Sequence, residues 1–320
     1  MRTRTRRSAI RCKRGIAVIA FSLTVFLSVV PGLSAGPLED GIAALESGDY
    51  ATALQILHPL AAKGDADAEY GLGHMYAMGL GVPQDYSAAQ NWFRLAADQG
   101  DSRAQFRLGF MYEQGDGVPQ DYAAAMSWYR KAADQGDSRA QLFLGSMYDT
   151  GHGVPQDYAK ALTWYSKAAD HGEAMAQYDL GDMYRDGHGV AQDYAEALKW
   201  FRKAADQGNV LAQDALGWLY EQGKGVPQNS NEAVKWYRKA ADGGLATSQL
   251  RLGFLYFLGR GVPQDYVQSH KWFNLAASRF QSSDHKNRDI AVEQRDTVAA
   301  LMTPAQIAEA QRLASEWKPN

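Results

Sequence analysis

Apolar and polar positions alternate with a helical period through most of the chain, and one stretch shows the pattern clearly. Between Gly100 and Gly115, apolar residues follow the i, i+4, i+7, i+8 spacing of one helix face: Ala104, Leu108, Met111 and Tyr112. Asp101 can cap this helix and Gly115 can end it. After a short turn, a second helix is predicted between Asp121 and Gly136, and its buried face holds Tyr122, Ala125, Trp128, Tyr129, Ala132 and Ala133.

This pair of helical patterns recurs every 36 residues. The string Gly-Val-Pro-Gln-Asp-Tyr begins at Gly81, Gly117, Gly153 and Gly261, with altered copies at Gly189 and Gly225. Three further columns keep the same interval: Leu72, Leu108, Leu144, Leu180, Leu216 and Leu252; Tyr76, Tyr112, Tyr148, Tyr184, Tyr220 and Tyr256; Trp92, Trp128, Trp164, Trp200, Trp236 and Trp272. A fixed period with paired helices predicts an all-α solenoid, because each unit buries its apolar side only against its neighbours.

The repeated columns resemble the Sel-one-like repeat family, a relative of the tetratricopeptide repeat. The resemblance lies in the Gly-Val-Pro-Gln-Asp-Tyr turn and in two runs, Ala104 to Tyr112 and Trp128 to Ala133, and it covers six repeats over residues 65–280. It implies a right-handed α-solenoid of tandem helix-turn-helix repeats whose first helices line a concave groove. It also implies adaptor work, since exported bacterial relatives act as scaffolds or regulators in envelope signalling, polysaccharide export and host contact.

One branch of that family is rich in cysteine and is linked to penicillin binding or β-lactamase activity. This sequence departs from that branch, because its one cysteine, Cys12, lies outside the repeats. No disulfide and no thiolate metal site is therefore expected in the repeats. We predict that the chain is not an enzyme and uses no cofactor.

The N-terminal 35 residues predict a secretory signal peptide. Seven Arg and Lys residues come first, an apolar run from Gly15 to Val30 follows, and small residues lie at Ser34 and Ala35. The alternative is an uncleaved membrane anchor, but the run is shorter than the roughly 20 apolar residues that a spanning helix needs. We expect cleavage near Gly36 and a periplasmic or secreted protein with no further membrane contact.

The repeats are expected to be closed at both ends. Residues 36–64 predict a degenerate N-terminal capping repeat, and residues 281–320 predict C-terminal capping helices. In the last helix, Thr303 and Gln306 form a capping-box pattern around Pro304. Such caps would cover the apolar sides that the first and last repeats leave open.

The charge of the exported chain argues against nucleic-acid binding. The whole sequence holds 33 Lys and Arg against 36 Asp and Glu, and removal of the seven leader cations leaves 26 against 36, a net charge of −10. Binding to nucleic acid depends on cationic side chains that neutralise phosphates. We therefore predict no nucleic-acid partner.

No catalytic or metal-binding pattern emerges from the sequence. It has no GxSxG or HExxH motif, and its two SxxK matches, at Ser283 and Ser315, lack the partner motifs of a penicillin-recognising site. His152 and His188 share a turn column, but zinc needs further ligands. Asp179, Asp182 and Asp186 share a helix face, which we interpret as an acidic solvated surface because calcium sites usually take ligands from loops. We predict no metal site.

Subtracting the repeated columns leaves one variable face on the first helices, at positions equivalent to 103, 107, 110 and 114. We expect this face to be exposed and to bind a protein or peptide, because arginine and aromatic residues are enriched at binding hot spots. The candidate binding residues are Arg103, Arg107, Phe110, Arg139, Phe143, Asp179, Asp182, Trp218, Arg251 and Phe254.

Two functions from different classes are compatible with these observations. The first is a non-catalytic, exported scaffold that holds a protein or peptide in the concave groove, for example as a regulator of envelope signalling or of exopolysaccharide export. The alternative is an envelope enzyme or glycan-binding protein, which only compartment and family analogy support. The sequence predicts neither the partner nor the oligomeric state.

Overall fold

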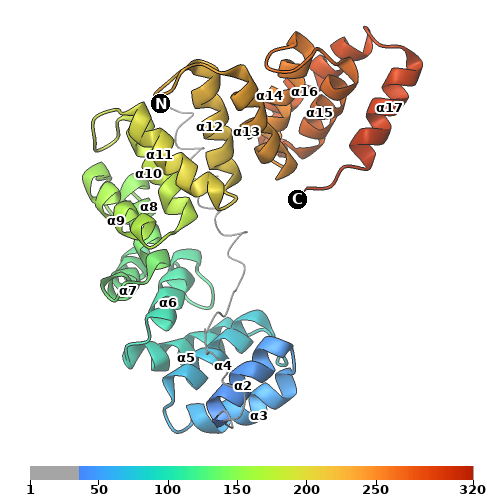
Figure 1. Cartoon of the computed structure of the whole chain (residues 1–320). Coiled ribbons are helices and arrows are strands. Elements are labelled where there is room, and N and C mark those ends of the chain that lie inside the picture. The colour runs from blue at the N-terminus through green and yellow to red at the C-terminus, as the bar shows by residue number, and fades with distance from the viewer. Residues whose placement is uncertain (1–35, 320) are drawn as a thin grey trace. The chain divides into compact units, whose positions relative to one another are not determined.

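A computed structural model describes residues 36–319, and this part of the chain is built from sixteen α-helices and one 3₁₀ helix, with no strand (Figure 1). The chain divides into two compact units, Met1–His171 and Gly172–Asn320. The first unit holds α2 to α9 and the second holds α10 to α17. The predicted signal peptide at residues 1–35 lies outside the described residues.

Six repeats of two helices each form most of the described chain. Their first helices are α4 (Ala66–Met78), α6 (Ser102–Gln114), α8 (Ser138–Thr150), α10 (Ala174–Asp186), α12 (Val210–Gln222) and α14 (Ala246–Leu258). Their second helices are α5 (Tyr86–Asp98), α7 (Tyr122–Asp134), α9 (Tyr158–Asp170), α11 (Tyr194–Asp206), α13 (Ser230–Asp242) and α15 (Tyr266–Arg279). The predicted all-α solenoid of tandem helix-turn-helix repeats is confirmed, and each unit contains three of the repeats.

The repeated Gly-Val-Pro-Gln-Asp string forms the turn between the two helices of a repeat. In the second repeat, Gly117 has a φ of +72°, and a Cβ there would lie 2.7 Å from the backbone of Tyr86 in the preceding repeat. Gln120 donates from Nε2 to the backbone oxygen of Glu113 at 2.8 Å, which satisfies a carbonyl at the end of α6. Asp121 then caps α7 by accepting from backbone N–H groups. The string therefore links two helix ends and the repeat before them.

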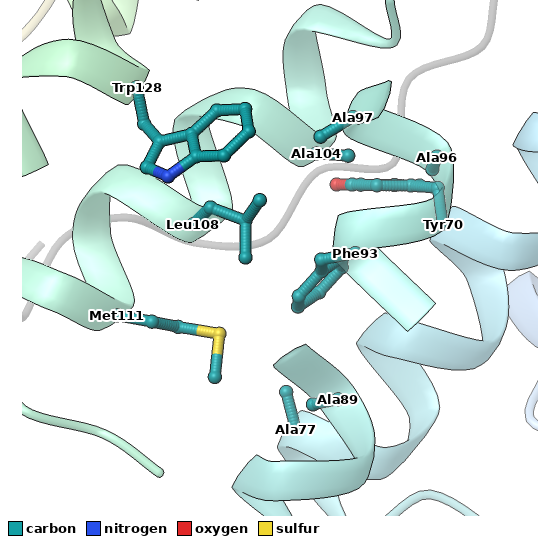
Figure 2. Close-up of a cluster of buried hydrophobic side chains, with 10 residues drawn as sticks. All are labelled: Tyr70, Ala77, Ala89, Phe93, Ala96, Ala97, Ala104, Leu108, Met111 and Trp128. Carbon is teal, nitrogen blue, oxygen red and sulfur yellow. The ribbon is translucent and has the colours of Figure 1, made fainter. Parts of the chain in front are cut away.

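Packing between repeats buries the repeated leucine column and part of the tryptophan column. At the junction of the first two repeats, Figure 2 shows Leu108 between the Trp128 ring and Phe93, beside a patch of alanines. Within the second repeat, a Cβ at Gly109 would lie 2.6 Å from a ring atom of Tyr129, so only glycine lets the ring of α7 lie against α6. Close packing of this kind, repeated at each junction, supplies the burial that holds each unit together.

At the N-terminal end, two helices precede the first repeat. They are α2 (Pro37–Ser47) and α3 (Tyr50–Ala61), and Asp49 caps α3 through the backbone N–H of Thr52. Leu45 of α2 and Leu57 of α3 are buried in one cluster with Leu72 and Met75 of α4. These two helices therefore cover the open side of the first repeat.

At the C-terminal end, the 3₁₀ helix η1 (Ser282–Asp284) leads into α16 (His285–Ala299), and α17 (Pro304–Ser315) follows. The capping box of Thr303 and Gln306 is formed as the sequence predicts. Trp317 lies 6.5 Å from the Trp272 ring, and Arg279 lies 4.3 Å above the Trp317 ring. The last repeat is therefore covered by α17 and the residues just after it. Across residues 36–319, every helix is too short or too polar to cross a membrane.

Candidate protein-binding surface

The predicted binding residues lie on what we call the first-helix face, formed by the four columns equivalent to positions 103, 107, 110 and 114. The structure differs from the expectation that all four columns are exposed. Gln114 and its equivalents Asp186, Gln222 and Leu258 are exposed. In contrast, Arg107 is 8% exposed. Its column faces the second helix of the preceding repeat, as the contacts of Phe143 with Tyr129 and of Arg251 with Tyr237 show. The face therefore grades from an exposed edge to a buried floor.

Arg103 shows how a cation is placed on this face in the first unit. Its guanidinium pairs with the carboxylate of Asp101, the N-cap of the same helix, and with Asp67 of the preceding repeat. It also lies 4.5 Å from the ring centroid of Tyr70. Although burial alone would lower it, the pKa of Arg103 is raised by the two carboxylates. The arginine is thus charged and held by a ring face and two acidic groups.

Arg139 repeats this arrangement one repeat later. It pairs with the N-cap carboxylate of Asp137 at 2.7 Å, and its guanidinium lies 4.8 Å from the ring centroid of Phe106. The side chains of Arg103 and Arg139 remain 31% and 33% exposed. The first unit therefore presents two arginines at equivalent positions, each fixed before any ligand arrives.

Arg107 and His74 form a buried pair of basic side chains below these arginines. Burial lowers the pKa of Arg107, and the Tyr70 hydroxyl offsets part of that effect. Burial, with the charge of Arg107 adding to it, lowers the pKa of His74 to about 4. His74 is therefore neutral at neutral pH. It occupies the column of Phe110 in the first repeat, which the variable-face prediction did not include.

An aromatic cluster surrounds Phe143 on the same face. Its ring centroid lies 5.4 Å from that of Phe106, 6.2 Å from Phe110 and 5.2 Å from Tyr129 of α7. The Tyr129 hydroxyl donates to Oε2 of Glu113 at 2.6 Å. Phe110 and Phe143, both predicted binding residues, therefore contact each other and are half-buried. They offer apolar edges to a ligand instead of whole rings.

In the second unit, the predicted acidic residues of α10 are more buried than a solvated surface would be. Asp179 is 7% exposed and Asp182 is 3% exposed. Arg185 pairs with Asp182 at 2.6 Å and with Asp186 at 2.9 Å. The interpretation of these residues as a solvated face is therefore wrong for Asp179 and Asp182 and holds only for Asp186, which is exposed.

Arg251 lies in a network that joins three helices of the second unit. Its Nη1 donates to the Tyr237 hydroxyl at 2.6 Å, and its Nε lies 3.7 Å from Oδ1 of Asp214. The Tyr237 hydroxyl donates to Oε2 of Glu221 at 2.7 Å, and Ser248 Oγ donates to Oδ1 of Asp214 at 2.7 Å. Burial raises the pKa of Tyr237, so its hydroxyl keeps its proton. Two carboxylates and one guanidinium are thus fixed around this hydroxyl.

Trp218 and Phe254 are half-buried parts of the same face. Trp218 lies 6.3 Å from the Tyr194 ring and packs against two core clusters, one at the junction of the fourth and fifth repeats and one at the junction of the fifth and sixth. Phe254 lies 5.0 Å from the Phe273 ring in an edge-to-face contact. Both residues therefore contribute to packing as well as to the surface, which the sequence-based assignment to a purely exposed face did not predict.

Four residues that support this face from neighbouring columns and from second helices were missed by the sequence analysis: Asp214, Glu221, Tyr129 and Tyr237. A signal for them is present, because an acidic residue stands 16 positions before each of three tyrosines of the second helices: Glu113 and Tyr129, Asp149 and Tyr165, Glu221 and Tyr237. Where the second helix has phenylalanine, that position is not acidic: Ala77 and Phe93, Arg185 and Phe201, Phe257 and Phe273. Comparing the column of Tyr129 with the column 16 positions earlier would have revealed these pairs of tyrosine and acidic residue.

The chemistry available on this face is that of binding. Among residues 36–319, no group of three or more His, Cys, Asp and Glu side chains is arranged to hold a metal ion. The SxxK matches lie outside the face: Ser283 is in η1, and Ser315 ends α17. Half-exposed rings beside fixed arginines and carboxylates can dock apolar and charged side chains of a partner.

Comparison with solved structures gives the same architecture. A protective antigen of uropathogenic Escherichia coli strains, which displays an SLR fold, is 35% identical with a TM-score of 0.80, and the match covers 88% of this chain. This chain spans 60% of the length of that antigen. A Sel1 repeat protein from Oxalobacter formigenes is 33% identical with a TM-score of 0.70, over 76% of this chain and 97% of its own. No curated protein sequence matches the chain.

The six helix pairs coincide with a known repeat. The model of the Sel1 repeat matches consecutive segments at residues 66–101, 102–137, 138–173, 174–209, 210–245 and 246–279. Each segment begins within one residue of the start of a first helix in the structure. The chain belongs to the Sel1 repeat family.

Proposed function

We propose that this chain is an exported, non-catalytic scaffold that binds a protein partner along the first-helix faces of its two units. Sel1 repeat proteins generally act as scaffolds for protein interactions. The observation that supports a binding role for this particular face is its variability: the columns that build the repeats recur every 36 residues, whereas the first-helix face changes from repeat to repeat. A surface whose residues differ between repeats of the same fold, and which carries arginines and half-exposed rings, suits recognition.

The residues that we assign to the partner are the ten predicted from the sequence, with roles adjusted to their burial. Arg103 and Arg139 would meet acidic groups of the partner, since each keeps about a third of its side chain exposed. Trp218 and Phe254 would supply apolar contact area. The buried residues Arg107, Asp179 and Asp182 would hold this surface in place from below. The half-buried residues Phe110, Phe143 and Arg251 would touch the partner at an edge.

Site-specific crosslinking tests this proposal. A photoreactive amino acid is placed at Gln114 and at Gln222, which are exposed on the first-helix face, and in matched variants at Lys199 and Lys235, which are exposed on second helices. We expect the first pair to crosslink one protein from the native envelope fraction and the second pair to crosslink none. Crosslinking only from the second helices would contradict the assigned face. Affinity for the purified partner should fall at least tenfold when Gln222 and Leu258 are both changed to glutamate, with an unchanged thermal melt.

The proposed export depends on the N-terminal 35 residues. Their basic leader, apolar run and small residues support cleavage by the secretory pathway. N-terminal sequencing of the protein from the periplasm or medium should begin within a few residues of Gly36. A chain that still begins at Met1 would favour a membrane anchor instead. Turnover of a penicillin or of a cell-wall glycan by the purified protein would favour the alternative function as an envelope enzyme.

A further inference from the structure

Helix α12 places Trp218, which belongs to the first-helix face of the second unit, between two carboxylates of neighbouring columns. Asp214, Trp218 and Glu221 stand at i, i+4 and i+7, so they share one side of the helix. All three are partly exposed, and the Asp214 side chain is 19% exposed. The other five first helices lack this order of residues.

The carboxylates beside Trp218 are held by groups that the fold does not require. Glu221 accepts from the Tyr237 hydroxyl and Asp214 accepts from Ser248 Oγ, each at 2.7 Å. Three repeats pack with phenylalanine in the column of Tyr237, and none of them has an acid at the position of Glu221. The hydrogen bonds therefore fix two negative charges at a place where other repeats fold without them.

Charge balance leaves this site negative. Among the described residues, Arg251 is the cation that pairs with Asp214, at 3.7 Å, and it reaches Glu221 only through the Tyr237 hydroxyl; its side chain is 37% exposed. Over the whole first-helix layer of the second unit, α10, α12 and α14 carry five carboxylates and two guanidiniums. A second cation beside Trp218 would therefore be attracted electrostatically.

The tryptophan rings of the chain give an independent argument. Six of the eight have a Lys or Arg of the chain over the ring, as Lys203 lies 3.8 Å from Trp200 and Lys239 lies 4.3 Å from Trp236. Among the described residues, no such cation lies over Trp218, although Asp214 and Glu221 flank it on the same side of α12. Trp92, which also lacks one, packs edge-on against His58. Trp218 thus keeps an unused cation-binding ring in an acidic setting.

We propose that Asp214, Trp218 and Glu221 recognise a lysine or arginine side chain of the partner protein, with the cation stacked on the indole and paired with the carboxylates. This inference rests on the proposed function and deepens it, because it names the chemistry that the second unit selects. A neutral sugar could also stack on the indole and donate hydroxyl hydrogen bonds to the carboxylates, but it would not gain the attraction between opposite charges that a lysine or arginine gains. The partner segment would carry one exposed cation next to apolar side chains that contact Leu211 and Phe254.

Synthetic peptides test the charge selectivity on the full chain. The probes are fluorescent, acetylated and amidated nonapeptides with two flanking leucines and a central arginine, lysine, citrulline or glutamate. In fluorescence anisotropy at low salt, we expect the arginine and lysine peptides to bind at least tenfold more tightly than the citrulline peptide, which keeps the shape of arginine without its charge. The glutamate peptide should bind most weakly. Equal binding of arginine and citrulline peptides, or no binding by either, overturns the inference.

Matched variants test the residues. Glu221→Gln and Asp214→Asn should each weaken binding of the arginine peptide at least fivefold, whereas Glu232→Gln, which neutralises a carboxylate paired with Lys235 on α13, should leave it unchanged. Trp218→Phe is the substitution least able to disturb folding, because positions 110 and 254 of the same column hold phenylalanine. It should weaken binding less than Trp218→Leu. Unchanged affinity in Glu221→Gln and Asp214→Asn overturns the inference.

The outcome separates this inference from the proposed function. If the crosslinked partner binds with the same affinity when Glu221 and Asp214 are neutralised, the scaffold function is supported and the cation site is contradicted. If no partner crosslinks to the face, but the arginine peptide binds and is weakened by Glu221→Gln and Asp214→Asn, the cation site is supported and the scaffold function is contradicted. Competition by a neutral oligosaccharide that is equally weakened in Trp218→Leu but insensitive to Glu221→Gln would assign the ring to a glycan and overturn the inference.

Discussion

The first helices of the two units have the same backbone and the same buried columns, but they begin with different chemistry. In the first unit each starts at an aspartate N-cap, and in two of the three this aspartate also binds an arginine two residues later. In the second unit the N-caps are Glu173, Asn209 and Leu245, and only Asn209 caps with its side chain. Met175, Leu211 and Thr247 stand where the first unit has Asp67, Arg103 and Arg139.

This difference distinguishes the residues that the fold of the repeat requires from those that can vary without changing the fold. A leucine, a glycine and alanines are buried at equivalent positions in both units. The aspartate N-caps and their arginines, Arg103 and Arg139, are therefore not required for the repeat fold, because the repeats of the second unit have the same fold without them. A scaffold built in this way can change the charge of its face without changing its fold.

The largest expected effect is on two tryptophans of the fifth repeat. Trp236 belongs to the repeated column and is 6% exposed, whereas Trp218 belongs to the variable face and is half-buried. We expect Trp236→Ala to lower the free energy of unfolding by about 3–5 kcal/mol, the range for truncation of a buried aromatic residue. Trp218→Ala should cost about 1–2 kcal/mol, within the range of typical substitutions. Urea denaturation of both variants measures the difference, and equal losses would contradict the division into structural and variable columns.

A pH effect of intermediate size should depend on the first unit. The pKa of His74 falls from its ordinary value of 6.5 to about 4 on folding. Between these two pH values, His74 is therefore protonated in the unfolded chain and neutral in the folded chain. Stability is therefore present above pH 6.5 and is lost as the pH falls toward 4. Between pH 7.5 and pH 5 we expect about 2 kcal/mol of loss from this residue, at about 1.4 kcal/mol per pKa unit.

Replacement of His74 by phenylalanine should remove that loss. The substitution copies Phe110 and Phe254, which occupy the same column in other repeats. Urea denaturation at both pH values, with His171→Gln as a control at an exposed position, isolates the contribution. A pH dependence that is the same in the wild type and in His74→Phe would mean that His74 becomes protonated without cost in the folded state.

The repeat architecture could be predicted from the sequence because its period is strict. Each first helix ends at or next to a glycine that the column marks, and Asp121 caps α7 where the sequence places a cap. The burial of the first-helix face could not be predicted in the same way. The pattern of one helix places Arg107 on the variable side of α6 and Asp182 on the same side of α10. It does not show that this side also meets the helices of a neighbouring repeat.

Interactions between variable positions were also beyond single-column reasoning. Tyr237 is aromatic in a column where every residue is Tyr or Phe, so the column alone explains the ring and leaves the hydroxyl unexplained. The structure shows that the hydroxyl meets Glu221 and Arg251. Only a comparison of two variable columns, or the coordinates, reveals that these three residues form one network.

The smallest expected effect comes from moving the first unit's cap into the second. Leu245 precedes α14 with φ −73° and ψ 109°, close to the φ −61° and ψ 111° of Asp101, so an aspartate there can accept from the backbone N–H of Ser248 as Asp101 accepts from that of Ala104. An N-cap is worth about 1 kcal/mol, and a negative charge suits the start of a helix. Asp214, which accepts from the Ser248 hydroxyl, is near enough to oppose part of that gain. We therefore expect Leu245→Asp to raise the free energy of unfolding by about 0.5–1 kcal/mol. Leu245→Asn, which copies Asn209 and adds no charge, should raise it by at least as much.

The matched substitution in the first unit, Asp101→Leu, should lower the free energy of unfolding by about 1–2 kcal/mol, because it also removes a carboxylate from Arg103. Urea denaturation of the three variants checks the series. A loss of stability in both Leu245 variants would show that the apolar contacts of this leucine, and not a missing cap, distinguish the start of α14 from the start of α6.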